Sequence, residues 1–358
     1  MQIHSLALKN FRSYARLGVQ FSGGINILQG ANAAGKTNVL EAIGLLSFGK
    51  SFRTGKDAEC IREGAQSAYI KGEIGKAAGK LTIESALARD GKKSLKINSE
   101  PVRRMGELFG HFIAVVFAPE DLKVLKESPS LRRRFIDMEI SKLRPAYFFA
   151  LQEYQKALAQ KNALLKSRMK AEQLQKLVAI YNEQMAEHGE KIISARGEFL
   201  ARLEQTGQTV HDHLSGGEKL TLKYRASVDG EHIKDALIQK MERSLQSEID
   251  QGFSLVGPHR EDLSVYIGGA EVKTYSSQGQ VRTAMLALKI ATLEIARADF
   301  EENPVLLLDD VFSELDETRQ KALLEYAQDV QCFITTAVPV RGVNGAVYTV
   351  ENGEVKPK

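Results

Sequence analysis

A glycine-framed loop followed by lysine and threonine contains the residue types in this chain best suited to chemistry. It comprises Gly30, Ala31, Asn32, Ala33, Ala34, Gly35, Lys36, Thr37 and Asn38. The spacing fits G-x-x-x-x-G-K-[ST], a loop whose backbone N–H groups cradle phosphate. A strand-like run at 24–29 leads into it and a helical pattern at 37–46 leads out, so the positive end of a helix would face the same phosphates. We expect Lys36 to reach the β- and γ-phosphates of a nucleotide and Thr37 to place its hydroxyl on Mg²⁺.

Two aspartates after an apolar run form a second candidate group. Val305 to Leu308 is typical of a buried strand, and Asp309 and Asp310 follow it directly. The carboxyl ends of parallel strands are where ligands bind in such sheets. Alone, the pattern also fits a strand that ends in a turn. Beside the phosphate loop it predicts that Asp309 holds Mg²⁺ and that Asp310 orients or deprotonates an attacking water, so Asp310 and Lys36 are the expected catalytic residues.

A serine and glycine turn that opens a helix is the third element. In ATP-binding-cassette (ABC) ATPases such a turn binds the γ-phosphate that a second copy holds. Two strings fit, at 214–218 and at 276–280. Because the residues after 214–218 alternate like a strand, we interpret that string as a structural turn. The other string precedes a strong helical pattern at 282–298, and it predicts nucleotide contacts by Ser276, Ser277, Gln278 and Gly279.

Four further loops have weaker signals. Ser313 to Asp316 resembles the D-loop of ABC ATPases, which predicts a nucleotide contact by Asp316, although Asp316 would also serve as a helix N-cap. Arg12, in a turn after the first strand, either contacts the nucleotide or is a surface residue of a β-turn, and Arg53 is a weaker candidate of the same kind. His259, in a Gly-Pro-His-Arg turn, fits a functional residue and a satisfied core histidine equally well.

A basic helical stretch follows the first α/β segment. Residues 121–170 contain 12 lysines and arginines against five acidic residues. The densest point is Arg132, Arg133 and Arg134. Such a run is either a solvated helix face or a surface that contacts nucleic-acid phosphates. DNA contact by these three arginines is therefore one of two predictions.

The order of elements along the 358 residues predicts an α/β protein. We expect an ABC-type P-loop ATPase head, with mixed sheets and helices, and an inserted, mainly helical second lobe. The ATPase lobe would span 1–118 and 213–358, and the helical lobe 119–212, with a polar tail after a last strand at 347–350. No apolar run approaches the ~18 residues of a membrane span, and the two cysteines show no metal-site spacing. We therefore expect a cytoplasmic protein that does not contact membranes.

Taken in order, these motifs resemble the RecF family of bacterial recombination-mediator ATPases, of the ABC/SMC class. The matching segments lie at 10–14, 30–43, 51–53, 117–122, 130–137, 154–165, 257–263, 276–280 and 306–316. The Phe-x-Pro-Glu-Asp-Leu, Arg-Arg-x-Phe-x-Asp and Gly-Pro-His-Arg strings among them are the most particular to that family. The resemblance implies an ATP-dependent homodimer in which two copies hold two ATP molecules with Mg²⁺. Each phosphate loop would face the other copy's Ser277.

The resemblance also implies DNA repair, recombination and replication restart in the SOS response. Such a dimer binds double-stranded and gapped DNA, is a weak, DNA-stimulated ATPase, and works with RecO and RecR to help load RecA. Asp310 and Thr336 stand where transporter-type ABC ATPases usually have glutamate and histidine, which also predicts slow hydrolysis.

Three alternatives remain at this point. The nucleotide-binding subunit of an ABC transporter is disfavoured by the basic helical insertion. A truncated structural SMC-type head would need far longer coiled-coil arms than this insertion supplies. A nucleotide-switched scaffold that never hydrolyses ATP differs from a slow ATPase only in turnover.

Overall fold

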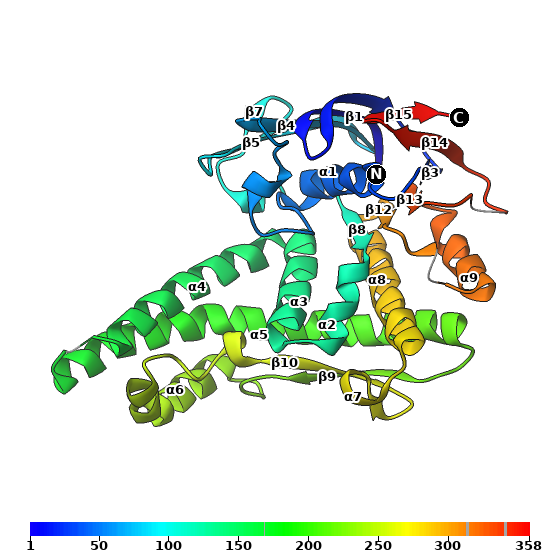
Figure 1. The fold of residues 1–358 in the computed structure, drawn as a ribbon. Helices are drawn as coiled ribbons and strands as arrows, with labels where there is room; N and C mark the ends of the chain where they lie inside the picture. Colours follow the sequence, from blue (N-terminus) through cyan, green and yellow to red (C-terminus); the bar gives the residue numbers. More distant parts are fainter. Residues whose placement is uncertain (168, 313–314, 340–341) are drawn as a thin grey trace.

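The computed structural model describes residues 1–167, 169–312, 315–339 and 342–358. Two lobes are stacked one above the other in the view of Figure 1. The upper lobe contains both termini, two six-stranded sheets and helix α1, and the lower lobe contains the long helices and a three-stranded sheet. This is the predicted α/β head with a mainly helical second lobe.

The outer sheet of the upper lobe is antiparallel, in the order β2-β1-β4-β5-β6-β7. Its strands are β1 (Gln2–Phe11), β2 (Tyr14–Gln20), β4 (Ser67–Lys76), β5 (Gly79–Ala88), β6 (Lys93–Ile97) and β7 (Glu100–Pro101). Apolar and polar residues alternate along these strands, because every second side chain of a strand faces the core. In β4, for example, Ile70 and Ile74 are fully buried while Glu73 between them is exposed.

The inner sheet contains the phosphate-loop strand and has the order β15-β14-β3-β13-β12-β8. Its strands are β3 (Ile25–Gln29), β8 (Ala114–Phe117), β12 (Val305–Leu308), β13 (Cys332–Thr336), β14 (Ala346–Glu351) and β15 (Glu354–Pro357). All are parallel except β15, and β8 and β12 are buried throughout, as their continuous apolar runs predict. The tail is polar as predicted, but it also contains a strand that was not predicted, since β15 pairs with β14 and buries Val355.

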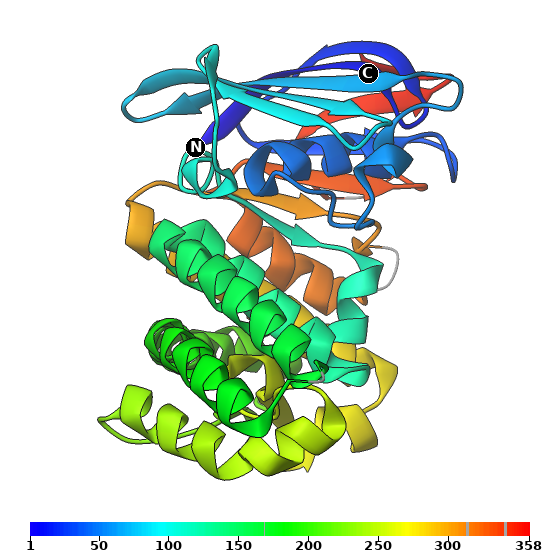
Figure 2. The ribbon, with the colours of Figure 1, turned by 90° about the vertical axis from the view of Figure 1, so that its left-hand side faces the viewer.

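Helix α1 (Lys36–Phe48) lies between the two sheets (Figure 2). It is buried on nearly every side, from Val39 through Phe48, so it joins both sheets into one core. Since α1 begins where the phosphate loop ends, this packing fixes the loop against the sheet.

The lower lobe consists mainly of helices (Figure 1). The helices after α1 are α2 (Leu122–Lys126), α3 (Pro129–Leu143), α4 (Pro145–Leu165), α5 (Ala171–Ser215), α6 (Ile233–Gln251), α7 (Val272–Tyr275), α8 (Gln278–Phe300) and α9 (Glu317–Ala327), of which α9 lies beside the inner sheet. Short 3₁₀ turns lie at Asp57–Cys60, Met105–Glu107, Pro119–Asp121 and Pro258–Arg260. Across the described ranges, no helix combines the length and apolar character that crossing a bilayer would require.

The 45-residue helix α5 organises the lower lobe. Val178, Met185, Ile192 and Phe199 recur every seven residues and are all buried. This spacing keeps the apolar residues on one stripe of the helix, and the stripe packs against neighbouring helices. Helix α5 contacts α4, α6 and α8, which makes it the central helix of the lobe.

The predicted boundary between residues 212 and 213 falls inside α5, so it is wrong as a point of division. The strands that follow it are β9 (Leu220–Arg225), β10 (Asp262–Ile267) and β11 (Ala270–Glu271), and they pair only with one another. Their alternating pattern predicts strands correctly but does not reveal the sheet to which they belong. We propose that the inserted lobe extends from residue 119 to about residue 275, where α7 ends.

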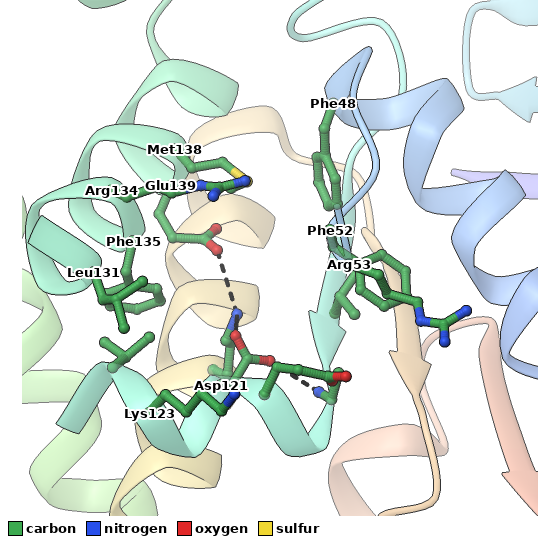
Figure 3. Close-up of a pocket in the computed structure, with 15 residues that line it drawn as sticks. Phe48, Phe52, Arg53, Asp121, Lys123, Leu131, Arg134, Phe135, Met138 and Glu139 are labelled. Atoms are coloured by element: carbon green, nitrogen blue, oxygen red, sulfur yellow. Dashed lines mark hydrogen bonds and ion pairs between the residues drawn. The ribbon is translucent and has the colours of Figure 1, made fainter. Parts of the chain in front are cut away.

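The two lobes meet around a small cavity of about 190 Å³ (Figure 3). Phe48 and Phe52 line it from the upper lobe, and Leu131, Phe135 and Met138 of α3 face them across the cavity. Behind the cavity, Lys289 of α8 contacts Asp121 at 3.0 Å and Glu139 of α3 at 3.7 Å. Because Asp121 follows strand β8 closely, this buried ion pair links the end of the inner sheet to helix α8.

Candidate functional site: a phosphate loop and its acidic sheet edge

The phosphate loop lies between β3 and α1, in the strand–loop–helix context that the sequence predicts. Gly35 has a φ of 108°, and a Cβ there would lie 2.9 Å from the side-chain oxygens of Ser13 and Tyr14. A Cβ on Gly30 would lie 2.2 Å from the carbonyl oxygen of Val350. Neighbouring atoms therefore leave no room for a side chain at either position. At Gly35 the positive φ also favours glycine.

Lys36 folds its side chain back over the loop. Its Nζ donates to the carbonyl oxygens of Gly30 and Ala31, each at 2.8 Å. Burial lowers the pKa of Lys36, and the nearby Asp310 and Asp309 carboxylates oppose that shift. The cation is thus held at the mouth of the loop, at the position from which the motif's lysine contacts phosphate.

Asp309 connects the two strands beside the loop to the first turn of α1. Its Oδ1 accepts hydrogen bonds from the hydroxyls of Thr37 at 2.7 Å and Thr335 at 2.8 Å. Asp309 is 5% exposed, and burial raises its pKa although both hydroxyl bonds favour the charged form. The local sequence assigns no role to Thr335, and only the pairing of β12 with β13 brings it to Asp309.

The oxygens of Thr37 and Asp309 fit Mg²⁺, which prefers hard oxygen donors and takes few ligands from the protein when phosphates supply others. Within the described ranges, no group of three or more histidines, cysteines and carboxylates could hold a metal by itself. We therefore expect the ion to depend on a bound nucleotide.

Asp310 lies on the exposed side of the same edge. Its φ is 52°, in the left-handed region, and its N–H donates to the Thr335 hydroxyl at 2.8 Å. The turn directs the chain away from the strand immediately after Asp309, so the two adjacent carboxylates are placed differently, one buried and one exposed. This separation suits one metal ligand and one group that faces water, as predicted, although the catalytic role stays a prediction.

Arg12 lies beside α1 and is paired with a carboxylate that sequence analysis missed. Its Nη2 and Nε contact Glu41 at 2.6 and 2.8 Å, and Arg53 contacts the same carboxylate at 3.5 Å. Burial lowers the pKa of Arg12, but Glu41 outweighs it and leaves that pKa raised. The sequence signal that could have revealed Glu41 is that it is a single acidic residue within the apolar helical run 39–46. A nucleotide contact by Arg12 stays a prediction.

Ser277 is the N-cap of α8, so the predicted serine turn does open a helix. Its hydroxyl accepts a hydrogen bond from the N–H of Gln280 at 3.2 Å. The side-chain oxygen of Gln280 in turn accepts from the N–H of Ser277, which completes a capping box. Gln278 and Gly279 form the first turn, where helix N–H groups lack partners within the helix. The string is thus shaped for an anion, and nucleotide contact by it and by Ser276 stays a prediction.

Ser277 is far from the phosphate loop of its own chain. Lys289, which contacts Asp121 near the end of β8, is twelve positions further along α8. Twelve residues of α-helix correspond to about 18 Å. Figure 1 also shows this separation, because α7 and the start of α8 lie in the lower lobe and α1 lies in the upper one. Ser277 can therefore meet a phosphate loop only if the loop belongs to another copy.

The other signature-like string is a turn, as the sequence predicts. Helix α5 ends at Ser215, and Gly216 follows with a φ of 77°. Glu218 then accepts a hydrogen bond from the Gln280 side chain at 2.9 Å. The turn is therefore hydrogen-bonded to the first turn of α8.

The predicted D-loop is only partly described. Ser313 and Glu314 lie outside the described residues. Asp316 is the N-cap of α9, accepts from the Arg319 N–H at 2.9 Å, and pairs with the Arg319 guanidinium at 2.7 Å. Its predicted capping role is confirmed, and nucleotide contact by Asp316 stays a prediction.

The three consecutive arginines of α3 have different environments. Arg132 is 4% exposed and forms two bonds to Asp262, at 2.7 and 2.9 Å, so its burial disfavours the predicted contact with DNA. Arg133 is half-buried and donates to the carbonyl of Glu261 at 2.7 Å. Arg134 is exposed. Helical geometry explains the difference, since consecutive residues point 100° apart, and DNA contact by Arg133 and Arg134 stays a prediction.

His259 is half-buried, and both of its ring nitrogens have partners within the chain. Its ring nitrogens face the Tyr154 hydroxyl at 2.7 Å and the carbonyl of Ser254 at 3.1 Å. Burial lowers the pKa of His259 to about 4, so the ring is neutral near pH 7. Arg260 donates to the same Ser254 carbonyl and stacks over Phe253 at 4.8 Å.

Comparisons with known proteins agree with this geometry. A family model described as the RecF/RecN/SMC N terminal domain matches residues 2–346. The "DNA replication and repair protein RecF" of Clostridium beijerinckii is 41% identical over 364 residues, covering 99% of this chain and 98% of the relative. A solved structure described as the recombination mediator protein RecF-ATP in the RecFOR pathway is 37% identical, with a TM-score of 0.93, and covers 100% of this chain and 97% of that one.

More distant structures share the fold alone. The Smc head domain of Pyrococcus yayanosii matches with a TM-score of 0.61 at 15% identity, covering 100% of this chain and 96% of that one. The ABC-type ATPase head fold is thus common to this chain and to both kinds of structure. The chain belongs to the RecF family within the RecF/RecN/SMC group of ABC-type ATPases.

Proposed function

We propose that this chain is an ATP-dependent DNA-binding protein of recombinational repair and a slow ATPase. The convergence of Lys36, Thr37 and Asp309 at the phosphate loop supports ATP binding with Mg²⁺. The similar solved structure is described as RecF with ATP, and the curated relative is named for DNA replication and repair. Membership of this family favours this function over a transporter subunit.

Each residue of the acidic edge has a separate task in this proposal. Lys36 neutralises the β- and γ-phosphates, and Thr37 and Asp309 hold Mg²⁺ beside them. Asp310 faces the solvent side and receives the proton of the attacking water. Its side chain is one methylene shorter than glutamate, so the water must approach more closely, which is consistent with slow turnover.

The second copy completes the site. Because Ser277 is remote from its own phosphate loop, we propose that two chains assemble head to head around two ATP molecules. The first-turn N–H groups of α8 then bind the γ-phosphate held by the other chain. By family likeness, the assembled dimer binds double-stranded and gapped DNA and works with RecR, RecO and RecA.

A mixing experiment tests this arrangement. Lys36→Met removes the phosphate partner, and Ser277→Arg blocks the signature turn, so either variant alone should form no dimer with ATP. A mixture of the two contains one intact composite site per heterodimer and should regain dimerisation, measured by light scattering. Failure of the wild type to dimerise with ATP would overturn the proposal, and an inert mixture would contradict a site shared between chains.

DNA specificity needs a separate measurement. Binding of the ATP-loaded protein to duplex, single-stranded and gapped DNA should be strongest for the gapped substrate and should weaken with salt. Equal affinity for the three substrates would contradict gap recognition. The Lys36→Met variant serves as the matched control, because it should lose whatever part of the binding depends on ATP.

A further inference from the structure

Two large apolar side chains are exposed beside the two half-sites. Within the described ranges, the large hydrophobic residues that are exposed are Ile180, Phe253, Tyr275 and Val338. Tyr275, 77% exposed, lies two positions before Ser277. Val338, 60% exposed, lies two positions after Thr336, on the segment that follows β13. The two most exposed of these side chains therefore flank the signature turn and the phosphate-loop edge.

Tyr275 is displayed from an anchored segment. Below it, Val272 of α7 is buried at 1% exposure. Beside it, the Lys126 ammonium donates to the carbonyl oxygens of Ser276 at 3.0 Å and Lys273 at 3.4 Å. These contacts hold the backbone on both sides of Tyr275. A rigidly presented aromatic side chain loses little conformational freedom on binding, which is typical of interface anchors.

Val338 is also presented by a constrained turn. The Thr336 hydroxyl donates to the Val338 carbonyl at 2.7 Å and accepts from its N–H at 3.2 Å. The Thr336 carbonyl in turn accepts from the N–H of Gly30, the first residue of the phosphate loop, at 3.2 Å. Val338 is thus tied to the loop that holds the nucleotide.

We propose that Tyr275 is the aromatic anchor of the ATP-dependent dimer and packs against Val338 of a second copy. This inference rests on the proposed function, because it requires the signature turn of one chain to face the phosphate loop of the other. Two residues of chain span at most about 7 Å, so Tyr275 lies close to Ser277 and Val338 close to Thr336. Assembly of the composite site therefore brings both apolar side chains to the same place.

The two-fold symmetry of the dimer doubles the number of these apolar contacts. Each Tyr275–Val338 contact occurs twice, once at each nucleotide. The apolar contact would also exclude water from the edge of the phosphate site and strengthen the charged interactions inside it. The anchor would thus couple nucleotide enclosure to association of the two chains.

Dimer affinity with a non-hydrolysable ATP analogue, measured by analytical ultracentrifugation, tests the anchor. Tyr275→Ala and Val338→Ala should each weaken dimerisation by about tenfold or more. Tyr275→Phe should retain most of the affinity, because it keeps the ring. The matched control is Ile180→Ala, which removes an exposed apolar side chain on α5 and should leave dimerisation unchanged. Thermal melts should match the wild type for all four variants, since each side chain is exposed.

A double variant tests whether the two side chains touch. If they do, Tyr275→Ala with Val338→Ala should cost clearly less than the product of the two single effects, because both remove the same contact. Multiplicative effects would overturn the pairing, and wild-type dimerisation by Tyr275→Ala would overturn the anchor. A loss of DNA binding by Tyr275→Ala with normal dimerisation would also overturn it. These outcomes differ from failure of the proposed function, in which the wild type itself does not dimerise.

Discussion

Each lobe contains a cluster of charged and polar side chains, but the two clusters differ in what they leave accessible. In the upper lobe, Asp309 is buried while its neighbour Asp310 is exposed beside the loop lysine. In the lower lobe, Arg196 is 2% exposed and contacts Asp137 at 2.7 Å and Glu261 at 2.8 Å.

The members of the lower cluster bond mainly to one another. Tyr147 donates to Asp137 and Tyr224 donates to Glu261, so both carboxylates have further donors besides Arg196. The cluster joins α3, α5 and β9 with the turn at 258–260. Such a network costs desolvation free energy when it forms, but removal of one member would leave the others buried without partners.

This difference separates chemistry from structural support. A charged group acts on a ligand only if part of its bonding capacity reaches solvent or a cleft, as at the phosphate-loop edge. In the lower lobe the sequence shows equally suggestive arginines and a histidine, but internal partners occupy most of their bonding capacity. Changes in the upper cluster should therefore alter rates, and changes in the lower cluster should alter stability.

The largest effect should come from Asp310→Asn. Because the amide cannot accept a proton from water, kcat for ATP hydrolysis should fall by roughly 10²–10⁴-fold. The midpoint of thermal unfolding should stay near that of the wild type, since Asp310 is exposed. Phosphate release with and without DNA measures the rate. Unchanged release would show that another group activates the water, and a large loss of stability would break the contrast between the clusters.

Arg132→Ala should show the opposite pattern. It removes the guanidinium that donates to the Asp262 carboxylate and to the carbonyl oxygen of Glu127, which should cost about 2–3 kcal/mol of unfolding free energy. ATP affinity should be unchanged. Urea unfolding and nucleotide titration measure the two quantities. A variant as stable as the wild type but weak in DNA binding would return Arg132 to the predicted DNA surface.

His259 predicts a pH dependence of stability. Its pKa is lowered to about 4 in the folded chain, against an ordinary value of about 6.5, so the unfolded chain binds more protons between these values. Its contribution is present above pH 6.5 and is lost as the pH falls toward 4, at a cost of up to about 3 kcal/mol. His259→Gln should flatten this part of the stability curve. An equally steep curve would assign the dependence to other groups.

The smallest effect should come from Arg134→Ala. Because this side chain is exposed, unfolding free energy should change by less than about 0.5 kcal/mol. If Arg134 contacts a DNA phosphate, affinity should fall modestly for all sequences and the slope of log K against log salt should decrease by about one. An unaltered slope would leave Arg134 a solvated residue.

Much of the fold follows from local patterns. Strands β3 and β12, helices α1 and α8 and the glycine loop appear where periodicity and motif spacing predict them. Two errors have a common cause. The assignment of 220–225 to the ATPase lobe and the missed strand in the polar tail both depend on which strand pairs with which, and alternation shows only that a residue run is extended.

The sequence by itself determined the chemistry at the phosphate loop, because the motif is contiguous and its function depends on backbone conformation that glycine alone permits. It also determined that Ser277 opens a helix, since capping depends on residues three positions apart. Only the tertiary structure decided that Arg132 and His259 have their partners within the chain, that Thr335 supports Asp309, and that Ser277 cannot reach its own loop. Burial and distance arise from contacts between segments far apart in the chain, and no local spacing encodes them.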